Sequence, residues 1–584
     1  MTEGTPLLVE AIRSEIDVVE MLRAYIRPST VMLAVVFGAV LAFASVFGGT
    51  LLETGFSSSD PSTLLAPFGA LAALFSILYV CIPLAANVAR DKLRVPRRDS
   101  STSKTGAASV IAPDWNRRSI ILHALVMFAA WLPYLIAVFP GTMNWDTAYQ
   151  IDQCYSDGTV WVVPWADTES VSDAHFSDHH PLFDTLLYGV FALSSDKLFG
   201  TWNYGVFAFV VLQAIFTAAT FTLATAYLGR IGSPRKLTAG VFLFFCLIPF
   251  YPFYAASMLK DSTFAPLFVL YFIMLVECAR TRGSSLAESK RAVACFVVLG
   301  LLLALTKKPG LYIVLLSSLV LVFVYRKAWK AFVLQAGVVV VVMMVLLPFA
   351  VFPALNVIPG EKQETLGTLF QQTARFVVQY PNEVTDDERA AIDRVIMFDG
   401  IDERYNPYCS DTVKFFYRYD TCTGDDLSNY LRVWIDQGLR HPWTYVESML
   451  VTTAPYITFD GELEVHENAM DVYNESPRVW QPAPLAPLKN AVVGLYHWLL
   501  NAPVLFALFR VGLYAYVVPS LVFIALVMRR SRYVPVFIPL ALSLAVCIVT
   551  PVFHARYALP LLYLTPLLVS LCFEREREAP TQNA

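Results

Sequence analysis

The chain has few charged residues for its length. Only 15% of its 584 residues are Asp, Glu, Lys or Arg, whereas 56% are hydrophobic and 41 are Phe. A soluble protein of this size could not bury so much apolar surface. The composition therefore excludes a soluble enzyme and predicts an all-α polytopic membrane protein.

Several familiar sequence signals are also missing. The nine cysteines form no CxxC pair and no zinc-like spacing, although Cys409 and Cys422 in a polar segment leave a local disulfide open. The first 25 residues lack the basic-then-apolar order of a cleaved signal peptide, so we expect the first span to remain as an anchor. There is no nucleic-acid signature and no internal repeat, and membrane lipids are the expected surroundings.

Apolar runs long enough to cross a bilayer recur along the chain. A transmembrane helix needs about 20 apolar residues, and by this criterion we expect about twelve. The expected spans are Thr30–Leu52, Thr63–Asn87, Ser119–Phe139, Trp202–Leu228, Leu237–Tyr254, Ser262–Ala279, Ala292–Thr306, Gly310–Tyr325, Ala331–Pro353, Pro503–Met528, Tyr533–Thr550 and Tyr557–Phe573.

Basic residues collect in alternate connections between these spans. The clusters lie at Arg90–Arg118, Arg230–Lys236, Arg280–Arg291, Arg326–Lys330 and Arg529–Arg532. Positively charged loops face the cytoplasm, so the pattern predicts a multi-pass protein of the cell membrane with both termini inside. The remaining connections are expected outside the cytoplasm.

This topology divides the chain into five parts. They are a cytoplasmic N-terminus (1–29), a transmembrane body (30–353) with a cytoplasmic linker (88–118) and a first outer loop (141–201), an extracytoplasmic domain (354–490), C-terminal transmembrane helices (491–573) and a cytoplasmic tail (574–584). The stretch Ala354–Asn490 holds 22 acids and 11 bases. We expect it to fold as a mixed domain with helices at Asp386–Met397 and Asp425–Gly438. Leu182–Phe199 is expected as an amphipathic helix on the outer surface, because a span there would invert every later loop.

The first outer loop concentrates carboxylates. From Gly141 to Pro181 it has no Lys or Arg and seven acids: Asp146, Asp152, Asp157, Asp167, Glu169, Asp173 and Asp178. Asp146 follows the third span directly. It is a candidate general base for a hydroxyl or amine acceptor, and the alternative is that it caps the next helix.

Two adjacent histidines close this loop. His179 and His180 follow Asp178 and precede Pro181. They allow three interpretations: a structural hydrogen-bonding pair, a contact with substrate or phosphate, or ligation of a divalent cation with Asp146 or Asp178. The sequence leaves all three open.

Four cations lie on the side where the positive-inside rule disfavours them. Lys260, Lys307, Lys308 and Arg556 each stand at a turn or span end. A lysine at the membrane edge usually reaches for water. Four on one side form a plausible phosphate cradle, and at this depth a lipid phosphate or diphosphate. The neighbouring candidates for substrate contact are Asp261, His554 and Tyr557.

These motifs together resemble GT-C-type membrane glycosyltransferases such as protein O-mannosyltransferases and lipid A aminoarabinose transferases. Asp146 stands where those enzymes carry an acid in an early outer loop, although Thr147 rather than a second acid follows it. The other matching stretches are His179-His180-Pro181-Leu182, with His180 in place of a proline, Thr306-Lys307-Lys308-Pro309-Gly310, and Arg556-Tyr557 with Pro560 and Pro566.

The resemblance implies a GT-C-like fold and a transferase function. A polyprenyl-phosphate sugar would be the donor, a glycan, lipid or protein the acceptor, and Asp146 the base; no cofactor is certain. One alternative is a transporter or flippase of an anionic lipid-linked substrate, which would also need cations near the membrane edge. Another is a non-catalytic relative that binds an acceptor.

Overall fold

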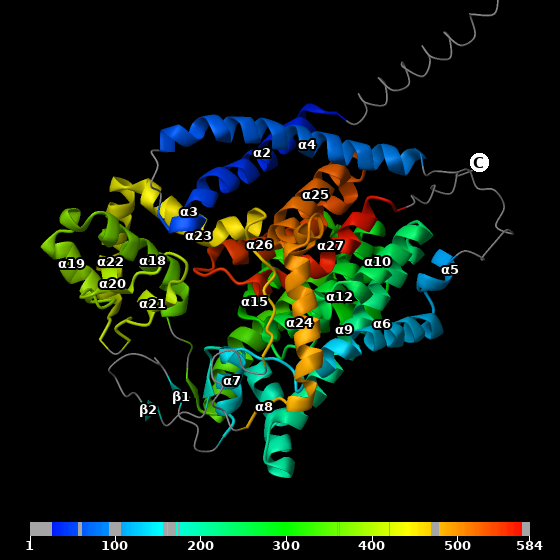
Figure 1. Ribbon diagram of the computed structural model, residues 1–584, viewed down its shortest axis with the longest axis horizontal. Coiled ribbons are helices and arrows are strands. Elements are labelled where there is room, and N and C mark those ends of the chain that lie inside the picture. The colour runs from blue at the N-terminus through cyan, green and yellow to red at the C-terminus, as the bar shows by residue number, and fades with distance from the viewer. Residues whose placement is uncertain are drawn as a thin grey trace, which may run out of the picture.

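The computed structural model describes residues 26–56, 61–92, 107–155, 160–161, 171–172, 176–358, 360, 362–419, 421–468 and 478–574 (Figure 1). Four of the loop acids, Asp157, Asp167, Glu169 and Asp173, lie outside the described residues. So do most of the predicted cytoplasmic N-terminus, the middle of the linker and the predicted tail beyond residue 574.

The described chain is helical, which confirms the predicted all-α class of a multi-pass membrane protein. Seven helices among the described residues are long and apolar enough to cross a membrane: Pro28–Thr54, Ser62–Arg90, Arg117–Ala137, Asn203–Arg230, Lys260–Arg280, Arg326–Ala354 and Ser531–Val549. Three shorter apolar helices follow the same pattern: Lys308–Val324, Leu513–Arg529 and Ala555–Leu571. These ten correspond to ten of the twelve expected spans.

The other two expected spans are helical but short. Leu237–Tyr254 is divided into α10 (Arg235–Leu247) and α11 (Phe250–Ala255). Pro249 lacks an N–H and disfavours a helical residue before it, and Ile248 is accordingly extended. Ala292–Thr306 is α14 (Lys290–Thr306), whose 17 residues reach only about 25 Å.

A large aromatic core holds the body together. It is built from α6 (Arg117–Ala137), α9 (Asn203–Arg230), α10, α12 (Lys260–Arg280) and α27 (Leu559–Leu571). The ring of Phe221 stacks on Phe245 with centroids 4.1 Å apart, and Trp131 donates to the Phe245 carbonyl at 3.1 Å. Such dense packing gives the loops at the helix ends a rigid support.

The first two long helices form a hairpin on one side of this core. α2 (Pro28–Phe43) and α4 (Leu65–Lys92) lie together at the top of Figure 1, beside α25 (Val518–Arg529). Tyr79 and Ser520 share a buried hydrogen bond of 2.8 Å across this contact. Outward-facing apolar residues such as Met32 and Ile77 are exposed, as expected of helices surrounded by lipid.

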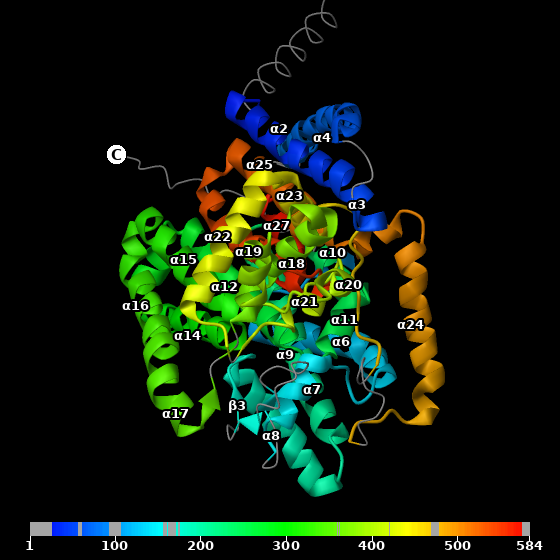
Figure 2. The same cartoon turned by 90° about the vertical axis from the view of Figure 1, so that its left-hand side faces the viewer.

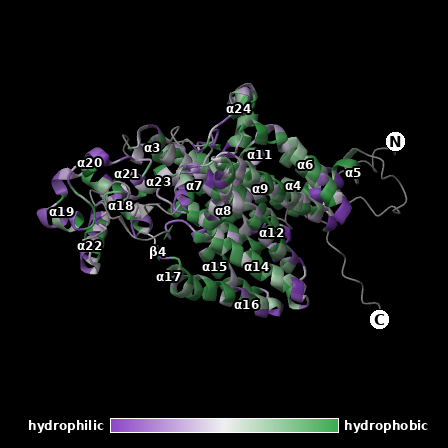
Figure 3. Ribbon diagram, turned by 90° about the horizontal axis from the view of Figure 1, so that it is seen from below, coloured by the Kyte–Doolittle hydropathy of each residue, from purple (hydrophilic) through white to green (hydrophobic). Residues whose placement is uncertain are grey.

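The polar segment between residues 354 and 490 folds as helices rather than as the mixed domain that we expected. It contains α18 (Gln363–Gln379), α19 (Asp386–Asp393), α20 (Ile401–Arg404), α21 (Asp411–Lys414), α22 (Gly424–Arg440) and α23 (Pro442–Ile457). Figure 3 shows hydrophilic residues gathered on α19, α20 and α22. They lie away from the apolar α14, α15 (Lys308–Val324), α16 (Trp329–Val340) and α17 (Phe352–Ala354). α18 to α22 enclose a separate core that includes Phe370, Ile396 and Tyr430. The predicted helices correspond to α19 and α22, and Cys409 and Cys422 are free thiols.

Strands are rare in the part of the chain that the structure describes. β1 (Val160–Trp161) pairs antiparallel with β2 (Val171–Ser172). β3 (Phe176–Ser177) pairs parallel with β4 (Val357–Ile358). The second pair joins the acidic loop to the start of the polar segment.

Two helices run across the direction of α2 and α4. α8 (Leu182–Phe199) and α24 (Ala486–Asn501) are upright in both Figure 1 and Figure 2, whereas the α2–α4 hairpin lies across the top. α8 confirms the helix predicted at Leu182–Phe199. α24 was not predicted, and the expected boundary at residue 490 falls inside it.

Candidate functional site

Six side chains from five separate segments meet in what we call the ion-pair cluster. Its members are Asp146, His180, Lys260, Asp261, Lys307 and Arg556. The Asp146 Oδ2 atom lies 3.4 Å from Lys260 Nζ and 3.3 Å from Arg556 Nη2. His180 Nε2 lies 3.9 Å from Asp146 Oδ1. The structure therefore brings together residues that are up to 410 positions apart.

A second carboxylate closes the inner side of the cluster. Asp261 Oδ1 accepts a 2.5 Å bond from Lys307 Nζ, and Asp261 Oδ2 lies 3.7 Å from Arg556 Nε. The Asp261 side chain is 1% exposed, whereas that of Asp146 is 25% exposed. Asp261 is thus a buried anchor for two cations, and Asp146 is the carboxylate of the two that solvent can reach.

Backbone pairing places Asp146 beside Lys260. Thr142 donates to Ala256 at 3.0 Å and accepts from Met258 at 2.7 Å, and the Thr147 hydroxyl donates to the Met258 carbonyl. These bonds fix the start of α7 (Trp145–Asp152) against the start of α12. The carboxylate and the ammonium then face each other from adjacent helix ends.

The capping alternative for Asp146 is wrong. Asn144 is the N-cap of α7, and its side-chain oxygen accepts from Thr147 N at 3.2 Å. Asp146 is the second residue of the helix, where an acid is stabilised by the positive end of the helix dipole. Its carboxylate makes its contacts with the cations of the cluster instead.

The histidine loop is held from two sides. Ser177 N donates to the Gln153 side chain at 2.8 Å, which ties the loop to the end of α7. Asp178 N donates to Ile358 O at 2.9 Å, next to the β3–β4 pair. Gln150 also bonds to Thr185 in α8, so the loop lies between two fixed helices.

The lysine turn is a break between two helices. Lys307 is extended and separates α14 from α15 (Lys308–Val324). A Cβ at Gly310 would lie 2.1 Å from the Leu303 carbonyl oxygen, so only glycine fits where α15 approaches α14. This close approach points Lys307 inward to Asp261, with its ammonium 5.0 Å from the Tyr557 ring.

The cations of the cluster control the charge of Asp146. Removal from water would raise the pKa of this carboxyl, but Lys260 and Arg556 hold its pKa well below the usual range. The carboxyl is therefore ionised at neutral pH. In this arrangement it is also a weak base, because two cations stabilise its negative form.

His180 is neutral in the same surroundings. Burial lowers the pKa of its imidazole well below the usual value, and the fields of Lys260 and His179 lower it further. Lys260 Nζ lies 2.9 Å from His180 Nδ1. A lysine ammonium can only donate, so Nδ1 accepts and we assign the ring proton to Nε2, which faces Asp146.

The other predicted site residues lie around the cluster rather than in it. Lys308 pairs with Asp178 at 3.2 Å, and burial raises the pKa of the Asp178 carboxyl while Lys308 opposes this. The His179 ring packs against His180 with centroids 4.3 Å apart. The His554 ring lies 5.3 Å from that of Tyr557, and burial and Arg556 lower its pKa to about 4. These five residues form the rim of the site.

One acid of the site was not found from the sequence. Asp184 lies in the first turn of α8 and is fully buried, and neither of its carboxyl oxygens has a hydrogen-bond partner among the described residues. Lys260 and Asp261 are its charged neighbours. The signal was an acid inside the apolar run Leu182–Tyr188, which we attributed to an amphipathic helix.

The described residues do not assemble a metal site. Within them, no three His, Cys, Asp or Glu side chains lie together so that they could hold an ion. In addition, His180 Nδ1 already accepts a hydrogen bond from Lys260. The interpretation of the histidine pair as metal ligands gains no support from these contacts.

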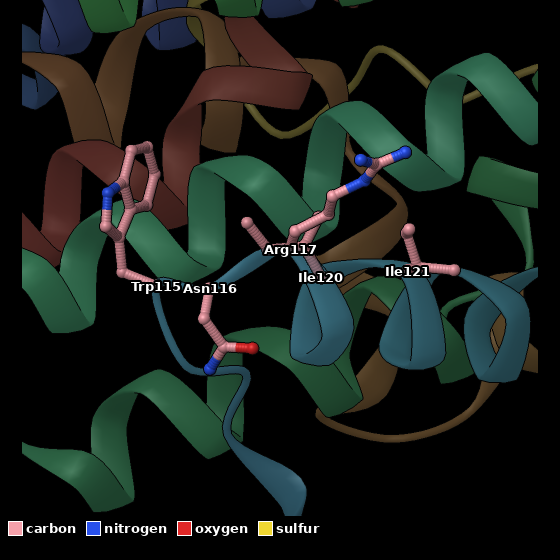
Figure 4. A pocket seen from close by; sticks show the side chains of 5 residues that line it. All are labelled: Trp115, Asn116, Arg117, Ile120 and Ile121. Carbon is pink, nitrogen blue, oxygen red and sulfur yellow. The ribbon is translucent and has the colours of Figure 1, made fainter.

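Two surface hollows lie at the opposite helix ends from the cluster. One, of about 440 Å³, is lined by Trp115, Asn116, Arg117, Ile120 and Ile121 at the start of α6, and its side chains point in different directions (Figure 4). The other, of about 600 Å³, lies at the start of α14 and is mostly apolar. Neither contains converging polar groups of the kind that the cluster has.

Comparison with known proteins gives a family but no function. No curated protein and no solved structure matches the chain. Residues 21–584 match the sequence model of DUF6020, described as a family of unknown function, and the chain therefore belongs to the DUF6020 family.

Proposed function

We propose that this protein is a membrane glycosyltransferase. It moves a sugar from a polyprenyl-phosphate donor to an acceptor on the outer face of the cell membrane, with Asp146 as general base. The proposal includes a GT-C-like arrangement of about twelve spans, with both termini in the cytoplasm. In this arrangement α8 lies along the outer surface, and the polar helices α18 to α22 are extracytoplasmic and bind the acceptor.

The observation that carries the proposal is the charge of the ion-pair cluster. Among the described residues, Lys260, Lys307 and Arg556 form ion pairs with two carboxylates, Asp146 and Asp261, while His180 is neutral. One positive charge is left over. A sugar linked through a phosphodiester carries one negative charge, so the donor would neutralise the cluster. Because the three cations come from separate segments, they can surround a phosphate from several sides.

Donor binding would also activate the base. The contacts of Asp146 with Lys260 and Arg556 are 3.3 to 3.4 Å long, and its side chain is 25% exposed, so a phosphate could compete for both cations. As they turn to the phosphate, Asp146 loses the charges that hold its pKa down. Its basicity then rises at the moment when the donor is in place.

The proposed chemical step is a single displacement. The acceptor hydroxyl donates its proton to Asp146 while its oxygen attacks the anomeric carbon. The bond from that carbon to the phosphate oxygen breaks, and its electron pair leaves with the phosphate, so the configuration inverts. Once Asp146 is protonated, the cluster has a net charge of two positive units, which matches the phosphomonoester dianion of the product.

The neutral His180 would orient the reacting groups. Its Nε2–H points to Asp146, and its Nδ1 holds Lys260. A neutral imidazole adds no charge that would oppose proton transfer to Asp146. His180 is therefore proposed to position the base and the acceptor rather than to exchange a proton.

The test is transfer from a labelled polyprenyl-phosphate sugar by purified protein in membranes. Asp146→Asn should lower the rate by about 10²- to 10⁴-fold, the usual contribution of a general base, without unfolding the protein. Asp196→Asn is a matched control, because Asp196 lies in α8 and bonds to Tyr155 away from the cluster. Equal transfer by Asp146→Asn and the native protein would remove Asp146 from the mechanism. A transporter would instead move the lipid across liposomes without forming a glycoside.

A further inference from the structure

Asp184 is a buried acid that the proposed reaction does not use. It follows Pro181, the N-cap of α8, by three residues and is fully buried. Both carboxyl oxygens lack a hydrogen-bond partner among the residues that the structure describes. The groups that face it are Lys260 and Asp261 on α12 and Tyr188, one turn further along α8. Its carboxyl is therefore close enough to Lys260 and Asp261 to feel their charges, without a hydrogen bond to either.

An acid in this position is held neutral. Burial raises the pKa of the Asp184 carboxyl well above its usual range, Lys260 opposes this only in part, and the negative charge of Asp261 adds to it. A buried carboxylate without a partner would be strongly destabilising. The protein thus keeps a protonated carboxyl next to a lysine whose ammonium bonds to Asp146 and His180.

The shared lysine creates a problem for the reaction. An acceptor hydroxyl must reach the open side of Asp146, where Lys260 Nζ now lies 3.4 Å from Oδ2. Arg556 has Asp261 as a second carboxylate, and Lys307 is bound to Asp261 as well. Lys260 has no such second carboxylate among its hydrogen bonds. When it leaves Asp146, it shares the single negative charge of the donor phosphate with Lys307 and Arg556, and it has no carboxylate of its own among the described residues.

We propose that Asp184 is a positioning residue that serves as the second counter-ion of Lys260. The inference rests on the proposed transferase function. When the acceptor occupies Asp146, Lys260 turns to Asp184. The Asp184 proton then leaves through the open side of the cluster, where Asp146 is 25% exposed, and Asp184 becomes a carboxylate. After the product leaves, Asp184 regains a proton and Lys260 returns to Asp146. The base is in this way covered between turnovers and uncovered only when the acceptor is bound.

Asp184→Asn tests this role in the transfer assay, because asparagine keeps the shape of the acid but cannot ionise. We expect kcat to fall by about tenfold to a hundredfold with the KM for the donor unchanged. In the native protein kcat should rise with pH as Asp184 becomes able to ionise, and this rise should be absent in the variant. Asp196→Asn, on the same helix, should keep both kcat and its pH dependence. A native kcat and pH profile in Asp184→Asn would overturn the proposal.

An infrared measurement tests the same idea without any substrate. The substrate-free protein should show the carbonyl stretch of one protonated buried carboxyl, and Asp184→Asn should lack it. In Asp146→Asn, Lys260 has lost its carboxylate partner, so Asp184 should ionise and the band should weaken. A band of full strength in Asp146→Asn would overturn the proposal, even if Asp184→Asn fails to fold. Absence of transfer with every donor, together with a band that weakens as expected, would reject the transferase function but not the link between Lys260 and Asp184.

Discussion

Two ion-pair sites in this protein differ in the balance of their positive and negative charges. In the polar helices, Arg375 in α18 pairs with Glu447 in α23 at 2.9 Å, and their side chains are 0% and 3% exposed. Arg375 also donates to Gly55 O and Tyr405 OH, and Gln379 donates to Glu447. One charge meets one charge, with neutral partners around them. The ion-pair cluster instead has three cations for two ionised carboxylates, and one of these, Asp146, is 25% exposed and makes longer contacts of 3.3 to 3.4 Å.

The difference separates a structural site from a candidate binding site. A balanced and enclosed pair has no charge left for a ligand, and it joins α18 and α23 to the end of the first long helix through Gly55. An unbalanced and partly open cluster needs an anion to complete it. Under the proposed function, the donor phosphate would be that anion.

The largest effect on stability is expected from breaking the balanced pair. Glu447→Gln leaves the Arg375 guanidinium buried without its carboxylate, which should destabilise the protein by about 3–5 kcal/mol. Thermal unfolding in detergent would show a clearly lower midpoint. Adding Arg375→Met to this variant should recover part of the loss, because no buried charge then remains. An unchanged midpoint in Glu447→Gln would contradict the structural role.

The next effect is expected from removing the charge imbalance of the cluster. Arg556→Gln takes away the spare positive charge and the only side chain that contacts both Asp146 and Asp261 among the described residues. Loss of a charged hydrogen bond of about 1.5–3 kcal/mol should weaken donor binding by roughly tenfold to a hundredfold. Binding of a polyprenyl-phosphate to the purified protein would measure it. Arg389→Gln, whose exposed pair with Asp399 lies in the polar helices, should bind as the native protein does.

A smaller effect, on the loss of stability at acid pH, is expected from His554 at the rim of the site. Its pKa is lowered in the folded state from 6.5 to about 4, so between these values the unfolded chain takes up a proton that the folded protein does not. Stability from this group is complete above pH 6.5 and is lost as the pH falls to about 4. His554→Gln should therefore reduce the fall of the thermal midpoint over this range. A steeper fall of the thermal midpoint in His554→Gln would show that folding does not lower the pKa of His554.

The smallest effect is expected at the exposed edge of the cluster. Lys308 pairs with Asp178 at 3.2 Å, and its side chain is 45% exposed. A surface pair of this kind contributes about 0–1 kcal/mol, so Lys308→Gln should hardly move the thermal midpoint. The matched change Lys307→Gln, one residue away but buried on Asp261, should lower it clearly. Equal effects of the two variants would mean that burial does not distinguish them.

Much of the fold was predictable because it depends on local composition. Apolar runs predicted nine helices to within about five residues, since each must satisfy its own backbone in lipid. The helix expected at Pro503–Met528 begins ten residues later, at Leu513. The single span expected at Leu237–Tyr254 was wrong because Pro249 interrupts it. The folding of the polar segment as helices, and the helix α24, were missed because their apolar faces depend on neighbours from elsewhere in the chain.

The candidate site was predictable only as a set of residue types. The positive-inside rule singled out Lys260, Lys307 and Arg556 because it predicts few cations in the connections expected outside the cytoplasm. It gave no way to place Lys308 on the rim and Lys307 inside, since adjacent residues point in different directions at a helix break. Asp184 was missed because an acid in a short helix looks solvated until the packing around it is known.

By itself, the sequence determined that this is a helical membrane protein with charged residues at particular helix ends. Hydrophobic length and loop charge are sums over neighbouring residues, so they can be read along the chain. Only the tertiary structure decided which of these charges meet. Coulomb energy depends on distance and burial, and both are set by contacts between segments far apart in sequence, such as the bonds from Thr142 to Ala256 and Met258.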